Sequence, residues 1–103
     1  MSLTSAPITQ VVFRRWRDTK DIFALFPESP SDYEGYYCDS YQTIGGHGGA
    51  DYSRCIHATD PVTVVEAADL IRELERIGYR LKPIKRASWR IHEARRNTAK
   101  SLK

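Results

Sequence analysis

The sequence has only two cysteines, Cys38 and Cys55, among its 103 residues. Two are too few for the disulfide framework that holds small secreted domains together. No apolar run comes near the ~18 residues that a membrane-spanning helix needs. The chain also does not open with the charged start and apolar run of a signal peptide. We therefore expect a cytoplasmic protein that does not enter a membrane, with both cysteines as small apolar groups.

The sequence also lacks the signatures of common cofactor and metal sites. It contains neither a P-loop nor a G-x-G-x-x-G fingerprint. The Cys55-Ile56-His57 triplet has no second pair of ligands at the regular spacing that zinc sites show. We therefore expect no cofactor and no bound metal.

The composition, with 41% apolar and 28% charged residues, predicts one folded domain. Its charge is unevenly distributed. Residues 18–60 contain eight acids and two bases, whereas residues 79–103 contain nine bases and one acid. This asymmetry predicts an acidic partner for the basic end: nucleic acid, a membrane surface or an acidic protein, including the acidic region of a second copy. The alternative is a solvated tail.

The first half of the chain has the pattern of a strand meander. Residues 8–16 are rich in β-branched and aromatic types, as strands are. A short polar turn separates them from the apolar residues 21–26, and the two segments predict a hairpin. Residues 27–35 contain two prolines and predict a loop. Residues 36–44 alternate in character and predict a third strand.

The clearest local signal is an amphipathic helix over residues 63–77. Thr63 and Glu66 match a capping box, in which a hydroxyl and a carboxylate satisfy free backbone amides. The apolar residues that follow have a helical period, and Gly78 supplies the left-handed residue that ends many helices. A shorter helix is expected after Asp51, a favourable N-cap residue.

Residues 79–85 predict a fourth strand, at a sheet edge because Pro83 cannot donate to a ladder. We therefore predict an α+β fold: a small antiparallel sheet, made of a three-strand meander plus a fourth strand, with two helices on one face. The other face would then expose Trp16, Phe23 and Leu25, which favours a homodimer.

Four of the six glycines surround His47 in the stretch YQTIGGHGGADY. Free amides at a strand-to-helix corner can bind an anion or another small ligand. Alternatively, the glycines only supply the positive φ angles of a tight corner. His47 is the one weak candidate for acid–base catalysis, and no nucleophile motif accompanies it. The candidate ligand-binding residues are Gly45, His47, Gly48, Asp51 and Tyr52.

Residues 87–103 form a basic C-terminal extension, helical or partly disordered, after a domain of residues 1–86. If helical, the extension has a thin apolar stripe consisting of Ile91, Ala94, Thr98 and Leu102. Cations can neutralise phosphates, and rings can stack on bases. The predicted contact residues for nucleic acid or an acidic partner are Lys85, Arg86, Trp89, Arg90, Arg95, Arg96 and Lys100.

Three segments, DIFALFPE, YYCDSYQTIGGHGGADY and EAADLIRELERIGYRLKPIKR, together resemble a family of small bacterial proteins of unknown function. Its members are similar in an ALFPE strand, a G-x-H-G-x-A-D loop and an ELE-x-x-GY helix end, over roughly residues 11–86. Gly46 departs from the pattern, where a larger polar residue is expected. The resemblance implies no activity, but it implies one recurring unit formed by Gly45, His47, Gly48, Asp51 and Tyr52.

These patterns favour a non-enzymatic binding or accessory module with a basic C-terminal contact surface. The alternative is a small enzyme, or a protein that binds an anion or another ligand through the His47 loop.

Overall fold

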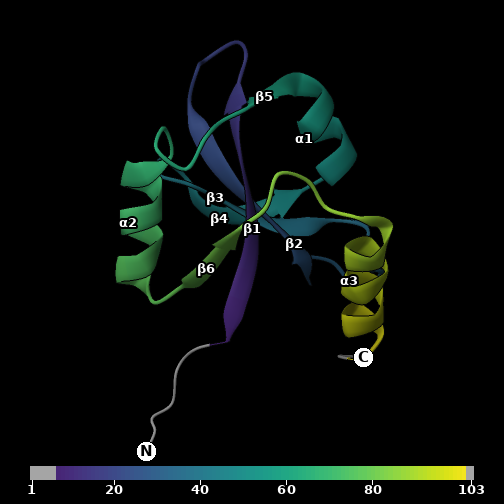
Figure 1. Cartoon of the computed structure of the whole chain (residues 1–103). Coiled ribbons are helices and arrows are strands. Elements are labelled where there is room, and N and C mark those ends of the chain that lie inside the picture. The colour runs from purple at the N-terminus through teal and green to yellow at the C-terminus, as the bar shows by residue number, and fades with distance from the viewer. Residues whose placement is uncertain (1–6, 102–103) are drawn as a thin grey trace, which may run out of the picture.

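The computed structural model of the protein describes residues 7–101. Figure 1 shows a central sheet with helices on both of its sides. In chain order the elements are β1 (Ile8–Trp16), β2 (Ile22–Pro30), β3 (Cys38–Gln42), β4 (Gly46–Ala50), α1 (Tyr52–Ala58), β5 (Thr59–Pro61), α2 (Ala68–Ile77), β6 (Arg80–Pro83) and α3 (Trp89–Ser101).

The sheet is mostly antiparallel, with the strand order β4-β3-β2-β1-β5. β6 pairs in parallel with β1 at residues 8–11, and β5 pairs antiparallel with β1 at residues 14–16. Both short strands therefore lie beside β1, one next to each end. The predicted α+β class with a small antiparallel sheet is confirmed. Within the described residues the sheet has six strands rather than four, and there are three helices.

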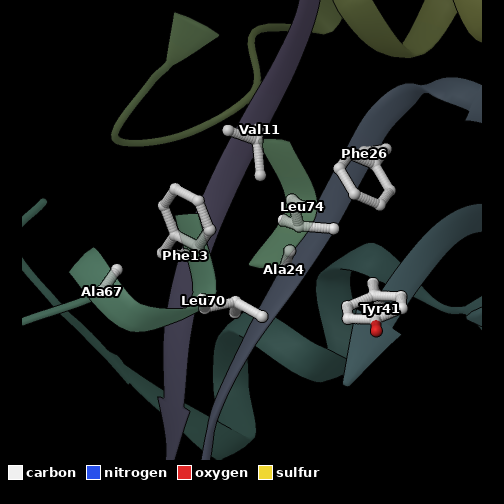
Figure 2. Packing of buried hydrophobic residues seen from close by; sticks show 8 residues of the cluster. All are labelled: Val11, Phe13, Ala24, Phe26, Tyr41, Ala67, Leu70 and Leu74. Atoms are coloured by element: carbon white, nitrogen blue, oxygen red, sulfur yellow. The ribbon is translucent and has the colours of Figure 1, made fainter. Parts of the chain in front are cut away.

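Both faces of the sheet are apolar, because neighbouring side chains along β1 and β2 point in opposite directions. On one face, side chains from the strands pack against α2, and Figure 2 shows this first core from close by. Leu74 of α2 and Ala24 of β2 are completely buried there. The members of the first core are Val11, Phe13, Ala24, Phe26, Tyr41, Ala67, Leu70 and Leu74.

A second core lies on the opposite face, next to α1 and α3. The prediction that the helices cover a single face is therefore wrong. Phe23 and Leu25 are buried, and Trp16 is partly buried with its ring stacked on Phe23 at a centroid distance of 4.6 Å. The apolar face that was expected to favour a homodimer is thus covered by the chain's own helices. The members of the second core are Val12, Phe23, Leu25, Cys38 and Tyr52.

The glycine-rich stretch forms a hairpin rather than a strand-to-helix corner. β4 pairs antiparallel with β3, and His47 lies opposite Tyr41. The turn between the strands places Gly45 and Gly46 at φ angles of 107° and 70°. Glycine adopts such angles without the strain that a side chain would add. β4 forms one edge of the sheet and leads directly into α1.

β2 extends through both prolines of the segment that was predicted to be a loop. The register against β3 shifts between Phe26 and Pro30, as it does at a β-bulge. A bulge tolerates proline because the residues inside it need not donate to the ladder. The loop prediction is therefore wrong for residues 27–30.

The predicted capping box is present, although α2 begins later than expected. Thr63 Oγ1 accepts a hydrogen bond of 3.1 Å from the Glu66 N–H, and the Glu66 carboxylate accepts one of 2.9 Å from the Thr63 N–H. Residues 64–67 form a turn, and regular helix begins at Ala68. Gly78 ends the helix as predicted, and its N–H donates to carbonyls of the last turn.

α3 packs directly on the backbone of the loop between β2 and β3. A Cβ atom added to Gly35 would lie 2.8 Å from the Arg96 Cα and 3.1 Å from the Ala99 Cβ. Gly35 also has a φ angle of 76°. The helix can approach this closely only because residue 35 carries no side chain.

We expect Gly35→Ala to lower the free energy of unfolding by about 1–3 kcal/mol more than Gly46→Ala, because only residue 35 is overpacked. Gly46 is the matched control: its φ angle is 70°, and nothing lies within 4 Å of an added Cβ. Urea denaturation followed by far-UV circular dichroism measures the difference. Equal losses for the two variants would contradict direct packing of α3 on this loop.

Candidate functional site

The sheet places the residues of the glycine-rich stretch on opposite faces. His47 lies on the α2 face, where its Nε2 is 2.8 Å from the Tyr79 hydroxyl and its ring packs edge-on against Tyr41. Tyr52 is buried on the other face, where its hydroxyl accepts a hydrogen bond of 2.7 Å from the Ala87 N–H. The structure therefore does not bring the five predicted ligand-binding residues into one site.

The His47 side chain belongs to a polar cluster on an open surface. The Tyr41 hydroxyl donates to the Glu73 carboxylate, which also accepts a hydrogen bond of 3.1 Å from the Thr43 hydroxyl. Burial raises the pKa of the nearby Asp39, and the His47 imidazole opposes that rise. The imidazole itself is exposed, and its contacts with the Tyr79 hydroxyl and the Tyr41 ring orient it.

The remaining residues of the predicted set have local roles. Asp51 caps α1, and its carboxylate accepts a hydrogen bond of 3.2 Å from the Arg54 N–H. Gly48 lies within β4, where its carbonyl accepts a hydrogen bond of 3.0 Å from the Ser40 hydroxyl. Gly45 lies in the hairpin turn. Asp51 also lines a cavity.

Both cysteines are free thiols. Cys38 is completely buried, and burial raises its pKa to about 11, so it behaves as the small core group that the sequence predicts. Cys55 is partly buried beside the second core, and burial raises its pKa too. No group of three or more potential metal ligands occurs within residues 7–101.

A cavity of about 450 Å³ lies between the start of α1 and α3, and we call it the α1–α3 cavity. It joins parts of both predicted sets, because Asp51 and Tyr52 line it together with Trp89, Arg95 and Arg96. The sequence could not show this, since about 40 residues separate the two segments. The lining residues are Tyr36, Asp51, Tyr52, Ser53, Trp89, His92, Glu93, Arg95 and Arg96.

Arg95 was predicted to contact a partner, but it is only 2% exposed. Its Nε donates to the Gly35 carbonyl at 2.8 Å, and its Nη1 donates to the Pro27 carbonyl at 2.7 Å and to His92 Nδ1 at 2.8 Å. Burial lowers the pKa of Arg95 below its ordinary value, but a guanidinium stays charged in proteins. Arg95 therefore anchors α3 and is not part of an exposed contact surface.

The buried face of α3 differs from the predicted apolar stripe. α3 buries Arg95 and Ala99, with His92 partly buried nearby. Ala94 and Thr98 of the predicted stripe are exposed, so that prediction is wrong, and Leu102 lies outside the described residues. The buried positions do follow a helical spacing, but an arginine in their centre gives no apolar signal.

His92 is held as a neutral hydrogen-bond donor. Its Nδ1 accepts from the Arg95 guanidinium, so the proton of the neutral ring is on Nε2. Burial lowers the pKa of His92, and the charges of Arg95 and Arg96 lower it further. The Tyr52 ring packs edge-on against the imidazole at a centroid distance of 4.8 Å. One wall of the α1–α3 cavity is therefore an uncharged imidazole at neutral pH.

Two exposed rings, each with an arginine beside it, lie at this cavity. Trp89 is 67% exposed, and the Arg90 guanidinium carbon is 5.6 Å from the centroid of its ring. Tyr36 is 62% exposed, and the Arg96 guanidinium carbon is 5.7 Å from its ring centroid. Neither arginine has an ion-pair partner within residues 7–101. We call these four residues, Tyr36, Trp89, Arg90 and Arg96, the α3 surface.

The other three predicted contact residues, Lys85, Arg86 and Lys100, do not line the α1–α3 cavity. Lys85 lines a different cavity, next to Phe13 and Val62. Arg86 and Lys100 are exposed and line neither of these two cavities. Of the predicted contact set, the exposed residues Trp89 and Arg96 line the α1–α3 cavity, and Arg90 lies beside the Trp89 ring.

Comparison with known proteins adds no functional information. No protein-family model, no curated protein and no solved structure matches the chain. The resemblance to a bacterial family of unknown function therefore stays a prediction. Within residues 7–101, the helices are too short or too polar to cross a membrane.

We expect Arg95→Met to lower the free energy of unfolding by about 2–4 kcal/mol, because it leaves the buried carbonyls of Pro27 and Gly35 without donors. Met keeps the apolar volume of the stem. Arg96→Met is the matched control on an exposed position, and we expect a change within about 0.5 kcal/mol. Guanidinium denaturation measures both variants. A loss for Arg95→Met no larger than that of the control would contradict the anchoring role.

We expect His92 to make the protein less stable as the pH falls. Its pKa in the folded chain lies below the ordinary 6.5, so the unfolded chain takes up the proton first. The stabilisation is present above pH 6.5 and is lost as the pH falls through the lower pKa of the folded chain. Urea denaturation near pH 7.5 and near pH 5.5 should show a larger loss for the wild type than for His92→Gln. Equal losses would show that the imidazole is not held neutral.

Proposed function

We propose that the protein is a non-enzymatic module that binds single-stranded nucleic acid on the α3 surface. The observation that carries this proposal is the pair of exposed rings, each beside an arginine without an ion-pair partner, at one cavity. Proteins that bind single strands combine aromatic platforms, on which bases stack, with cations that follow the phosphates. Stacking needs unpaired bases, which favours a single strand over a duplex.

The mixed polarity of the α1–α3 cavity supports a base rather than a phosphate as its occupant. The His92 Nε2–H and the Ser53 hydroxyl can donate hydrogen bonds, whereas the carboxylates of Asp51 and Glu93 can accept them. A nucleobase edge presents both donors and acceptors. The two carboxylates would repel a phosphate next to them, whereas Arg96 at the same cavity would attract one.

The same carboxylates distinguish nucleic acid from an acidic protein patch. A row of Asp and Glu side chains would bring only negative charge toward Asp51 and Glu93, which disfavours close contact. A nucleotide can instead place its base in the cavity and its phosphate beside Arg90 or Arg96. The proposed arrangement thus uses the cavity and the two exposed arginines together.

Fluorescence anisotropy with a short labelled oligothymidylate tests the proposal. We expect salt-dependent binding, and we expect Trp89→Ala to weaken it by about 1–3 kcal/mol through the loss of stacking. Arg90→Ala and Arg96→Ala should each reduce the slope of log affinity against log salt by about 1. Arg76→Ala, in the last turn of α2 on the other face, is the matched control and should bind like the wild type.

Two results would overturn the proposal. One is an affinity for the oligothymidylate that none of the α3-surface variants changes relative to Arg76→Ala. The other is a failure to bind the oligothymidylate while polyglutamate binds and depends on Arg90 and Arg96, which would assign the surface to an acidic protein.

A further inference from the structure

A second cavity lies where β5 and β6 leave a gap beside β1. β6 pairs with β1 as far as Val11, and β5 pairs with β1 from Arg14 onward. The cavity has a volume of about 610 Å³ and is lined by residues that flank this gap. It shares no lining residue with the α1–α3 cavity, so its occupant is independent of the proposed nucleic-acid surface.

The wall of this cavity is largely apolar. Phe13 of β1, which belongs to the first core, lines it together with Val62 and Val64 from the segment before α2 and Ile84 from the segment after β6. A volume of this size with apolar walls and few polar groups is typical of sites for small organic molecules. The capping box fixes the backbone of the Val62–Val64 side, because it bonds Thr63 to Glu66.

The cavity has one charge that the structure does not compensate. Glu66 forms an ion pair of 3.0 Å with Arg15, and its pKa is lowered by the hydrogen bond from the Thr63 backbone and by Arg15. The negative charge of the Glu66 carboxylate is therefore compensated by Arg15. Lys85 also lines the cavity, is exposed, and has no ion-pair partner within residues 7–101. An occupant with one negative charge complements this arrangement.

We propose that this cavity binds a small organic anion, namely a carboxylate with an apolar aliphatic or aryl body. The apolar body packs on Phe13, Val62 and Ile84, where burial of apolar surface supplies the affinity. The carboxylate lies at Lys85, which supplies the preference for an anion.

A titration of the full-length chain followed by ¹H–¹⁵N NMR tests the proposal, with octanoate, octan-1-ol and octylammonium as probes of equal chain length. We expect saturable shifts at the amides of Val62, Val64 and Ile84, with octanoate bound most tightly. Lys85→Ala should lower the affinity for octanoate about two- to fivefold, which is the factor expected for one exposed ion pair. The affinity for octan-1-ol should stay unchanged.

A second pair of variants tests where the apolar part of the ligand lies. Val64 lines the cavity and is 52% exposed, so Val64→Trp should fill the space and abolish binding of octanoate and octan-1-ol. Val65 is 81% exposed and does not line the cavity, so Val65→Trp is the matched control and should bind normally. If Val64→Trp does not fold, the Lys85→Ala comparison alone decides the question.

Three outcomes would overturn the proposal. The first is octanoate binding no tighter than octan-1-ol or octylammonium. The second is an octanoate affinity that Lys85→Ala does not lower. The third is a set of shifts at the cavity amides that depends on protein concentration without any probe, which would assign the groove to a second copy of the chain.

Discussion

The position of α3 depends on the buried guanidinium of Arg95. A buried charge is tolerated only where its donors are satisfied, and Arg95 donates to the carbonyls of Pro27, Gly35 and Tyr36 and to one imidazole on its own helix. Because the planar guanidinium donates in fixed directions, these bonds define the place of the helix on the sheet. The wall of the α1–α3 cavity and the exposed ring of Trp89 both follow from that placement.

Neighbouring residues are adapted to this anchor. Gly35 supplies both an acceptor carbonyl and the missing side chain that lets α3 approach. His92 accepts from Arg95 and remains neutral, which avoids a second positive charge in the buried region. Arg96 follows Arg95 directly in the helix and therefore points to a different side, where it lies over Tyr36. One basic segment thus provides a buried anchor, Arg95, and an exposed arginine, Arg96.

The fold was predictable where local patterns decide it. The β1–β2 hairpin, the N-cap at Asp51 and the helix end at Gly78 follow from alternation, capping and backbone freedom. The strand at Gly46–Ala50 was not predictable from local patterns, because glycine has a low strand propensity. Only the pairing with β3 makes this segment a strand. The apolar residues on both faces of β2 were visible in the sequence, but which helix covers which face depends on long-range packing.

The candidate site was predictable only in part. The exposed Trp89, Arg90 and Arg96 were identified from the charge and aromatic pattern, which is local information. The burial of Arg95 could not be predicted from that pattern, because its acceptors, the Pro27 and Gly35 carbonyls, lie about 60 residues away in the chain. The cavity between α1 and α3 was not predictable either, because its two segments also lie far apart in the sequence. Charge composition therefore indicated the surface, and tertiary structure decided which cations belong to it.

Amide hydrogen exchange of the wild-type chain tests most directly whether α3 is an integral part of the fold. If Arg95 holds the helix on the sheet, the amides from Arg95 to Ala99 open only with the unfolding of the whole domain. Their protection should then approach that of Val11 and Val12 in β1. Exchange of these α3 amides at rates near those of an unstructured peptide, while β1 stays protected, would contradict the account.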